Sequence, residues 1–319
     1  MKIVVVSDLL TEKNISLIRE KAGEVKAEVS FFKKEEEALG EAREADIVYG
    51  YCPRIAAACE NLKWLCLPWA GVDRLMGKDF FANKDCIFTN SAGAYGVAIS
   101  EHMIGLVLML LRRIPEFEEG RMRREWLPPR RQKSIKGSRV TVLGAGDIGC
   151  TFARRIKAFE PSLLMGVNRS GKSSEAAFDR VLSVAELDKV LPETDILAMS
   201  LPGTPETVGI LSADRIGLLP PEAVVVNVGR GSAIDEKALA AALKEGRLWG
   251  AALDVFQTEP LPKDSELWDI KNLIITPHVA GNLTVDYTRD RNVEMFCEDL
   301  MNYCAGRPLM HLVDRKRGY

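Results

Sequence analysis

Short runs of aliphatic and β-branched residues alternate with segments of helical periodicity along most of the chain. This alternation is typical of βαβ units, because strands that are buried on both faces of a parallel sheet read as nearly continuous apolar runs. In the first third of the chain, the expected strands are 3–6, 28–32, 47–49, 64–67 and 87–89. The expected helices are 12–21, 35–44 and a long apolar helix at 97–113.

A second series of strands begins after Gly137. Its expected members are 140–143, 163–167, an edge strand around 181, 196–199, 224–227, 251–253 and 273–276, and a last helix follows at 285–303. Between the two series, residues 115–136 form a polar, arginine-rich segment that contains Pro128 and Pro129. A connection of that length is unusual, so we expect this segment to have a function of its own. The two series together predict an α/β protein with parallel sheets.

Composition narrows the class of protein. The chain has 319 residues, which is a usual length for two domains. Hydrophobic residues make up 47%, which excludes intrinsic disorder. Lys and Arg number 43 and Asp and Glu number 45, and the net charge of −2 gives no electrostatic case for binding nucleic acid or an anionic membrane. No apolar run approaches the roughly 20 residues that a membrane span needs.

The cysteines and the start of the chain predict a cytoplasmic protein. The seven cysteines are odd in number and none forms a C-x-x-C pair, so we expect buried, reduced thiols. Residues 1–8 contain no secretory apolar region. Cys52, Cys59 and Cys66 recur every seven residues, but burial in the core is the preferred interpretation, and we expect no metal site.

A glycine-rich loop begins the second series of strands. The apolar run 140–143 leads directly into Gly144-x-Gly146-x-x-Gly149, and a helical pattern follows. In this setting the first glycine permits the tight turn, the second lets the backbone approach a pyrophosphate, and the third lets helix and strand pack closely. The helix N-terminus then offers N–H groups to phosphate. A dinucleotide site is therefore predicted here, and the alternative is a purely structural turn.

The end of the next strand bears on which dinucleotide binds. An NAD site usually has a carboxylate there, which accepts a hydrogen bond from the ribose 2′-OH. This chain has Asn168, Arg169 and Ser170 at that place and no acidic residue. A guanidinium can pair with a 2′-phosphate, so the sequence favours NADP, with NAD as a further cofactor. The alternative is that Arg169 stacks on the adenine or faces solvent.

Three polar residues follow successive strands of the second series. Arg230 comes after 224–227, Glu259 after 251–253, and His278 after 273–276. Ligands of open parallel sheets bind outside the carboxyl ends of the strands, so all three are expected at the same edge as the glycine loop. A histidine can exchange the proton that accompanies hydride transfer, a carboxylate can orient and charge its ring, and an arginine can clamp a substrate carboxylate.

At these residues the chain resembles the D-isomer-specific 2-hydroxyacid dehydrogenase family, and it does so over nearly its whole length. The matching segments are 70–73, 144–149, 201–207, 227–231, 254–256 with 259–260, and 276–280. The resemblance implies an NAD(P)-dependent enzyme in which Arg230, Glu259 and His278 are catalytic. It also implies two doubly wound parallel-sheet domains and a homodimer formed through the cofactor domain. The flavodoxin-like, substrate-binding domain is expected at 1–96 plus 285–319, and the Rossmann cofactor domain at 97–284.

Further site residues complete this expectation. Tyr51 follows a strand end and is expected to line the side-chain pocket, with simple packing as the alternative. The remaining substrate-binding residues are expected to be Ala70, Gly71, Val72, Arg230 and His278. The expected cofactor-binding residues are Gly144, Gly146, Asp147, Ile148, Gly149, Asn168, Arg169, Ser170, Leu201, Pro202, Thr207, Val228, Gly229, Arg230, Asp254, His278 and Gly281.

Within the family, the chain is most similar to the NADPH-linked glyoxylate/hydroxypyruvate reductases. The similarity lies in residues 168–170, in 126–128 and in the tail 313–319. Two alternatives remain: a reductase of a bulkier 2-keto acid, and a non-catalytic protein that senses dinucleotides. An enzyme that oxidises formate is disfavoured, because related enzymes of that activity have glutamine where Glu259 stands. The small-molecule partner is thus expected to be a 2-keto or 2-hydroxy acid.

Overall fold

The computed structural model describes residues 1–72, 75 and 81–315. The chain forms two compact units, one made of Met1–Tyr95 with Asn282–Tyr319 and the other of Gly96–Gly281. We call these unit 1 and unit 2. The chain therefore enters unit 2 at Gly96 and leaves it at Gly281, and the last segment of the sequence returns to unit 1.

Unit 1 is built on a five-stranded sheet in which all neighbouring strands are parallel. The strand order is β2-β1-β3-β4-β5, which is the flavodoxin-like order of a doubly wound sheet. Its strands are β1 (Lys2–Val6), β2 (Glu28–Phe32), β3 (Ile47–Tyr49), β4 (Trp64–Cys66) and β5 (Ile87–Thr89). Its helices are α1 (Glu12–Glu24), α2 (Glu35–Ala42), α3 (Pro53–Ala58) and α10 (Asp286–Cys304).

The last helix, α10, completes the core of unit 1. Phe296 on α10 lies 4.9 Å from the Tyr49 ring and 5.4 Å from the Trp64 ring, measured between ring centroids. All three side chains are almost fully buried. Removing α10 would expose this aromatic cluster to water, which explains why the chain must return to unit 1.

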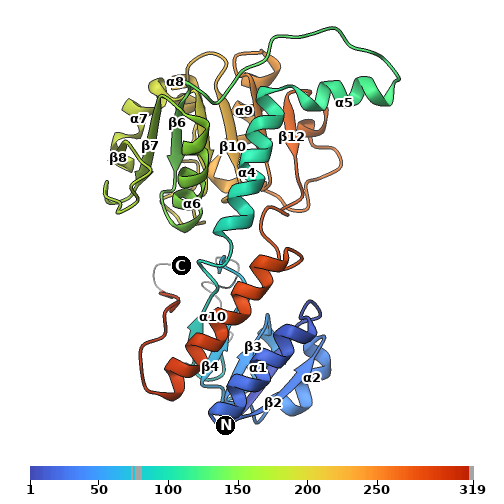
Figure 1. Cartoon of the computed structure of the whole chain (residues 1–319), viewed down its shortest axis with the longest axis vertical. Helices are drawn as coiled ribbons and strands as arrows, with labels where there is room; N and C mark the ends of the chain where they lie inside the picture. The colour runs from blue at the N-terminus through green and yellow to red at the C-terminus, as the bar shows by residue number, and fades with distance from the viewer. Residues whose placement is uncertain (73–74, 76–80, 316–319) are drawn as a thin grey trace. The chain divides into compact units, whose positions relative to one another are not determined.

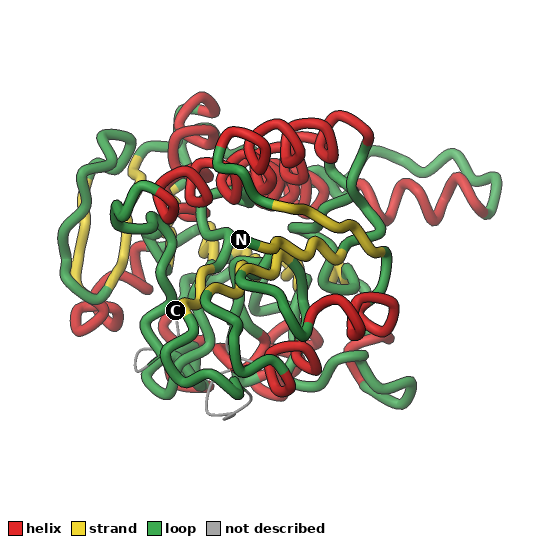
Figure 2. The backbone as a smooth tube through the Cα atoms, turned by 90° about the horizontal axis from the view of Figure 1, so that it is seen from below, coloured by secondary structure: helices red, strands yellow, loops and turns green. Residues whose placement is uncertain are grey.

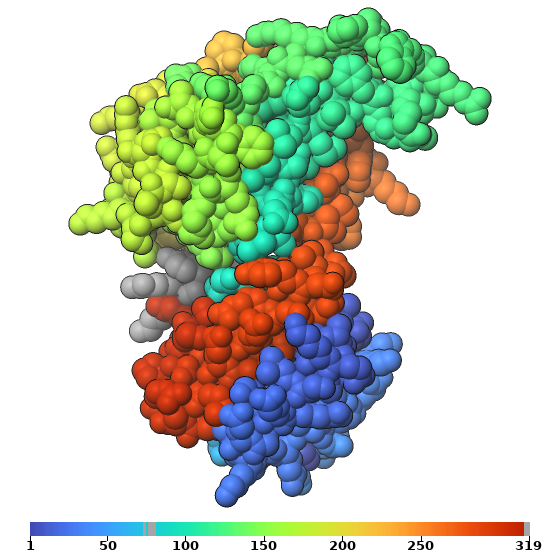
Figure 3. Space-filling model, in the orientation of Figure 1, coloured from blue at the N-terminus to red at the C-terminus, as the bar shows by residue number. Residues whose placement is uncertain are grey.

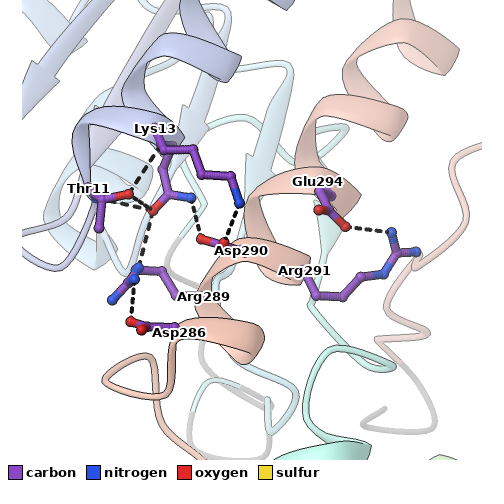
Figure 4. A network of polar contacts seen from close by, with 8 residues as sticks. Thr11, Lys13, Asp286, Arg289, Asp290, Arg291 and Glu294 are labelled. Carbon is purple, nitrogen blue, oxygen red and sulfur yellow. Dashed lines mark hydrogen bonds and ion pairs between the residues drawn. The ribbon is translucent and has the colours of Figure 1, made fainter.

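Helix α10 lies beside α1 in the space-filling view (Figure 3), and polar contacts join the two helices (Figure 4). Asp290 accepts hydrogen bonds from Lys13 Nζ at 2.6 Å and from Asn14 Nδ2 at 2.8 Å. Asn14 is buried, and its Oδ1 accepts from Thr11 at the N-cap of α1 and from Arg289 Nε of α10. One buried amide therefore both caps α1 and joins it to a helix that lies some 270 residues further along the chain.

Unit 2 contains a seven-stranded parallel sheet of Rossmann type. The order is β12-β11-β10-β9-β6-β7-β8, so the direction of winding reverses between β6 and β9. The strands are β6 (Arg139–Leu143), β7 (Leu163–Asn168), β8 (Arg180–Ser183), β9 (Ile196–Met199), β10 (Val224–Asn227), β11 (Gly250–Leu253) and β12 (Leu273–Ile275). The two doubly wound parallel sheets confirm the predicted fold class.

The helices of unit 2 include the long apolar helix that the sequence predicts (Figure 1). They are α4 (Gly96–Leu111), α5 (Ile114–Met122), α6 (Asp147–Ile156), α7 (Leu187–Val190), α8 (Ala213–Leu218) and α9 (Glu236–Lys244). Short 3₁₀ helices lie at Lys157–Phe159, Val184–Glu186, Leu191–Glu193, Gly231–Ala233 and Glu266–Asp269. Alternate buried residues of the strands and the buried residues of α7, α8 and α9 form a continuous core on one face of the sheet.

Residues 114–132, which we call the arm, stand away from the rest of unit 2 (Figure 1 and Figure 2). Much of the arm is the helix α5, which the sequence analysis missed. Pro115 occupies the first turn of α5, where a missing N–H breaks no hydrogen bond. The arm carries a fully exposed indole ring, because Trp126 is 100% exposed.

The base of the arm is fixed to the body of unit 2. Arg131 pairs with Glu222 at 2.9 Å, and Lys133 Nζ donates to the Glu222 carbonyl at 2.8 Å. The Lys133 ammonium also lies 5.1 Å from the Trp249 ring, a cation–π distance. Leu127 packs where a side chain on Gly120 would otherwise lie. The arm is therefore an anchored projection of unit 2 and not a loose connection.

The cysteines are all free. Cys52, Cys59, Cys66, Cys86 and Cys297 are buried, as predicted, whereas Cys150 is partly exposed and Cys304 is exposed. Burial raises the pKa of the Cys66 thiol to about 12, which suits a packing role. Over the described residues, no cluster of His, Cys, Asp or Glu side chains has the makings of a metal site. No helix in that part of the chain has the length and hydropathy to cross a membrane.

Candidate active site

Close backbone contacts join the loops that follow four strands of unit 2. A β-carbon on Gly144, after β6, would lie 2.9 Å from the Ser200 carbonyl, after β9. A β-carbon on Gly229, after β10, would lie 2.6 Å from Leu201 backbone atoms, and one on Gly231 would lie 1.9 Å from the carbonyl carbon of Phe256, after β11. Glycine is thus required at all three positions. The loops at the carboxyl ends of these four strands are therefore packed closely against one another. They include the loops after β6 and β9, between which the winding reverses.

The glycine loop has one position at which the protein itself does not require glycine. Gly144 has φ +106°, and a β-carbon on Gly149 would lie 2.2 Å from the Gly144 carbonyl oxygen. Backbone conformation and packing therefore already require glycine at these two positions. Gly146 is the N-cap of α6, and a β-carbon there would meet nothing within 4 Å. The space beside Gly146 is therefore open, which fits a pyrophosphate at the helix N-terminus. Asp147 and Ile148 form the first turn of α6.

The turn after β7 is shaped by Asn168. Its Oδ1 accepts from the Ser170 and Gly171 N–H groups at 3.1 and 2.8 Å, and its Nδ2 donates to the Lys172 carbonyl at 2.8 Å. The Arg169 and Ser170 side chains are exposed. No hydrogen bond or ion pair joins the Arg169 guanidinium to another residue that the structure describes. This turn therefore presents a guanidinium to solvent at the place where an adenosine ribose is expected.

The loop after β9 carries Leu201, Pro202 and Thr207. Thr207 Oγ1 donates to the Pro202 carbonyl at 2.7 Å and accepts from the Thr204 N–H at 2.9 Å, which closes the loop. The pKa of the Glu206 carboxyl is lowered, chiefly by a hydrogen bond from Thr204 and in small part by the Arg169 charge. The threonine hydrogen bonds therefore hold the loop that carries these expected cofactor-binding residues.

His278 and Glu259 form a hydrogen-bonded pair. His278 Nδ1 lies 2.8 Å from Glu259 Oε2, and the other oxygen, Oε1, accepts from the Phe256 N–H at 3.0 Å. Because a carboxylate only accepts, Nδ1 carries the proton and Nε2 is the atom left for a substrate. The His278 side chain is 42% exposed, whereas that of Glu259 is 18% exposed. The pair is therefore a fixed carboxylate behind an accessible imidazole, as the sequence predicts.

The backbone at His278 is held by Asp254. His278 adopts a left-handed conformation with φ 54°, and its N–H donates to the Asp254 carbonyl at 2.8 Å. The Asp254 carboxylate accepts from the Val279 and Ala280 N–H groups at 2.9 and 3.0 Å. Asp254 was expected to bind the cofactor, and that role stays a prediction. Its structural role was not foreseen: it shapes the loop that carries His278.

Arg230 follows β10 in a turn that Asn227 organises. Asn227 is fully buried, its Oδ1 accepts from the Gly229 N–H at 3.0 Å, and its Nδ2 donates to the Arg230 carbonyl at 2.9 Å. Arg230 Nη1 donates to the Gly229 carbonyl at 2.7 Å. The next residue, Gly231, contacts Phe256, whose N–H binds Glu259. The predicted triad therefore stands on neighbouring, interlocked loops. Val228, in the same turn as Arg230, is buried, and Gly281 is the last residue of unit 2.

The predicted substrate-binding residues outside this edge belong to unit 1. Tyr51 stacks on Trp69 with ring centroids 4.8 Å apart, and both rings are nearly half exposed. Asn90 Nδ2 donates to the Ala70 carbonyl at 2.8 Å, Gly71 is exposed, and Val72 is buried. Asp73 of the same motif and residues 316–319 of the tail lie outside the described residues.

The sequence of unit 2 matches a family model. Residues 104–280 match the D-isomer specific 2-hydroxyacid dehydrogenase NAD-binding domain. The matched segment includes the glycine loop, Arg230, Glu259 and His278. The chain belongs to the D-isomer specific 2-hydroxyacid dehydrogenase family. The matched model describes an NAD-binding domain, a solved structural neighbour is a complex with NADPH, and this protein is an oxidoreductase of that family.

Curated relatives support the same family. An uncharacterized protein encoded 3′ of proB in Corynebacterium melassecola is 32% identical over 89% of this chain and 93% of its own length. A glyoxylate/hydroxypyruvate reductase A of Klebsiella pneumoniae is 32% identical over 78% of this chain and 80% of its own. A D-3-phosphoglycerate dehydrogenase of Methanocaldococcus jannaschii is 33% identical, but the chain spans only 53% of that protein.

Solved structures share the whole fold. A D-isomer specific 2-hydroxyacid dehydrogenase family protein of Aeromonas salmonicida has a TM-score of 0.85 at 32% identity and covers 98% of this chain and 99% of its own. A D-isomer specific 2-hydroxyacid dehydrogenase of Xanthobacter autotrophicus, in complex with NADPH and MES, has a TM-score of 0.83 at 29% identity and covers 100% and 99%.

Proposed function

We propose that this enzyme reduces small 2-keto acids of the glyoxylate and hydroxypyruvate type to 2-hydroxy acids, with NADPH as the preferred cofactor. The observation that carries the proposal is the Glu259–His278 pair, which stands on the same interlocked loops as Arg230 and the glycine loop. The similarity to a glyoxylate/hydroxypyruvate reductase supports the substrate class, and the NADPH complex of a structural neighbour supports the cofactor.

Each residue of the triad has a chemical role in this reaction. The dinucleotide, when bound, supplies hydride to the keto carbon. His278, protonated on both ring nitrogens, donates the Nε2 proton to the keto oxygen. Glu259 holds the ring through Nδ1 and stabilises the positive charge before the transfer. Arg230 binds the substrate carboxylate, because a guanidinium matches the two carboxylate oxygens.

The two units have different proposed roles. Unit 2 holds the dinucleotide, with the pyrophosphate at the open side of Gly146 and the adenosine ribose at Asn168, Arg169 and Ser170. For unit 1, we propose substrate binding by Tyr51 and by the backbone of residues 70–72. These assignments follow the predicted division into a substrate-binding domain, 1–96 with 285–319, and a cofactor domain, 97–284.

A screen of NADPH oxidation tests the substrate class. We expect glyoxylate and hydroxypyruvate to give the highest kcat/KM, with pyruvate lower. A bulkier acid such as phenylpyruvate is the informative competitor, because the stacked, half-exposed Tyr51 and Trp69 rings offer an apolar surface. A higher kcat/KM for phenylpyruvate than for glyoxylate would replace the proposed substrate with a bulkier 2-keto acid.

Arg230→Lys tests the proposed carboxylate clamp. Lysine keeps the charge but loses the planar fork of donors. We therefore expect the KM of the keto acid to rise at least about tenfold and kcat to fall. Steady-state rates over a range of glyoxylate concentrations measure both constants. Unchanged constants would show that Arg230 does not anchor the substrate.

The arm suggests a homodimer formed through unit 2. Trp126 is fully exposed on the anchored arm, and a large exposed aromatic ring on a fixed support is typical of an interface. We propose that Trp126 reaches the active site of a second copy. Trp126→Ala should then lower kcat/KM, and sedimentation should show a dimer for the parent protein. A parent protein that sediments as an active monomer would contradict this proposal.

A further inference from the structure

Hydrogen bonds of the His102 and Thr276 side chains connect helix α4 to Asp254, which holds the loop that carries His278. His102 Nε2 on α4 lies 3.2 Å from Thr276 Oγ1, at the end of β12. The Thr276 hydroxyl lies 2.6 Å from Asp254 Oδ1. His102 Nε2 is also 3.9 Å from the same carboxylate oxygen. These residues all belong to unit 2, and α4 begins that unit while the 276–280 loop ends it.

The direction of these hydrogen bonds follows from the available protons. A hydroxyl has one proton to donate, and the short distance to a carboxylate places the Thr276 proton between Oγ1 and Asp254. The hydroxyl oxygen is then left to accept from His102, whose Nε2 must carry a proton. His102 therefore donates to Thr276, and Thr276 donates to Asp254.

Asp254 needs such support because it is almost completely buried. Its side chain is 1% exposed, and a buried carboxylate without compensating donors is unfavourable. The structure gives it the Thr276 hydroxyl and the backbone N–H groups of Val279 and Ala280. Within the described ranges, His102 is the one basic side chain whose nitrogen lies within 4.0 Å of this carboxylate.

The same carboxylate determines the path of the backbone at His278. Residues 279 and 280, which bind Asp254, follow His278 directly. The left-handed conformation of His278 is unfavourable for a residue with a side chain and persists only where its surroundings hold it. We propose that His102 is a positioning residue, which acts through Thr276 and Asp254 to keep the His278 ring aimed at the substrate. This inference rests on the proposed role of His278 as proton donor.

Substitution of His102 tests the inference. His102→Leu removes the donor, and we expect kcat for glyoxylate to fall on the order of tenfold, with the dissociation constant of NADPH nearly unchanged. His102→Gln places an amide N–H near the former Nε2 and should recover most of the activity. If His102 only packs in the core, His102→Leu should lower the melting temperature but should not lower kcat selectively while the dissociation constant of NADPH stays the same.

Thr276 provides an independent route if the leucine variant does not fold. Thr276→Ser keeps the hydroxyl and should stay near the parent kcat, whereas Thr276→Val, of nearly the same volume, should lose about as much as His102→Leu. The double variant His102→Leu/Thr276→Val should have a kcat no lower than that of the slower single variant, because both changes break the same pair of hydrogen bonds from His102 through Thr276 to Asp254. Additive losses in kcat would show that the two residues act independently and would overturn the proposal.

Two further variants separate this inference from the function on which it rests. Glu101→Gln, at the exposed neighbour of His102 on α4, is the matched control and should keep the parent kcat. His278→Asn tests the proton donor itself. If His278→Asn abolishes turnover but His102→Leu has the parent kcat, the positioning role is wrong and the proposed function stands. If His278→Asn is fully active, the proposed function fails first.

Discussion

His278→Asn should lose most of the turnover, by about 10² to 10⁴-fold, while NADPH binds with nearly the parent affinity. The loss has this size because general acid catalysis by one positioned group contributes a factor in that range. Asparagine cannot supply a proton at neutral pH, but it still offers a polar side chain to Glu259. Single-turnover absorbance measurements give the chemical step, and fluorescence titration with NADPH gives the affinity.

Asparagine is the suitable replacement for a structural reason. His278 has φ 54°, and asparagine tolerates the left-handed region better than most residues with a side chain. The backbone hydrogen bonds to Asp254 should therefore survive, and the loss can be attributed to the ring. His311→Asn, the same exchange at a histidine in the C-terminal tail, is the control and should leave the rate unchanged. A His278→Asn enzyme with the parent rate would refute the assignment.

The strands of the molecule were predicted almost to the residue. Parallel strands that are buried on both faces read as apolar runs, and residues 196–199 and 224–227 show this directly. Helix α5 was missed because its sequence, IPEFEEGRM, has no apolar face of helical period and contains a proline. Only a structure shows that this proline lies in the first turn, where a helix tolerates it.

The site also has a part that the sequence predicts and a part that only the structure shows. Glu259 and His278 were predicted together because each follows a strand end, and strand ends of a parallel sheet meet at one edge. The hydrogen bonds that support them were not predicted: His102 lies within the predicted apolar helix 97–113, and Thr276 lies at the end of the predicted strand 273–276. His102 and Thr276 lie 174 residues apart, and a contact over such a separation leaves no periodic signal in a single sequence.

The preference for NADPH should come from the turn after β7. The Asn168 side chain closes that turn and also accepts from the Ser170 hydroxyl at 3.2 Å, so the exposed Arg169 guanidinium is the group left to meet a 2′-phosphate. A charge-assisted hydrogen bond to phosphate corresponds to about 10- to 100-fold in affinity. We therefore expect kcat/KM for NADPH to exceed that for NADH at least about tenfold, and the ratio to shrink at high salt, because an exposed ion pair is screened.

Two variants show which residue sets that preference. Arg169→Ala alone should lower kcat/KM for NADPH and leave that for NADH nearly unchanged, because it removes the phosphate partner without adding a 2′-OH acceptor. Asn168→Asp with Arg169→Ala should reverse the order of the cofactors. The aspartate keeps the acceptor for the Ser170 and Gly171 N–H groups but loses the donor to the Lys172 carbonyl, so the turn must shift slightly. Equal kcat/KM values for the two cofactors in the parent enzyme would show that Arg169 faces solvent and does not bind the 2′-phosphate.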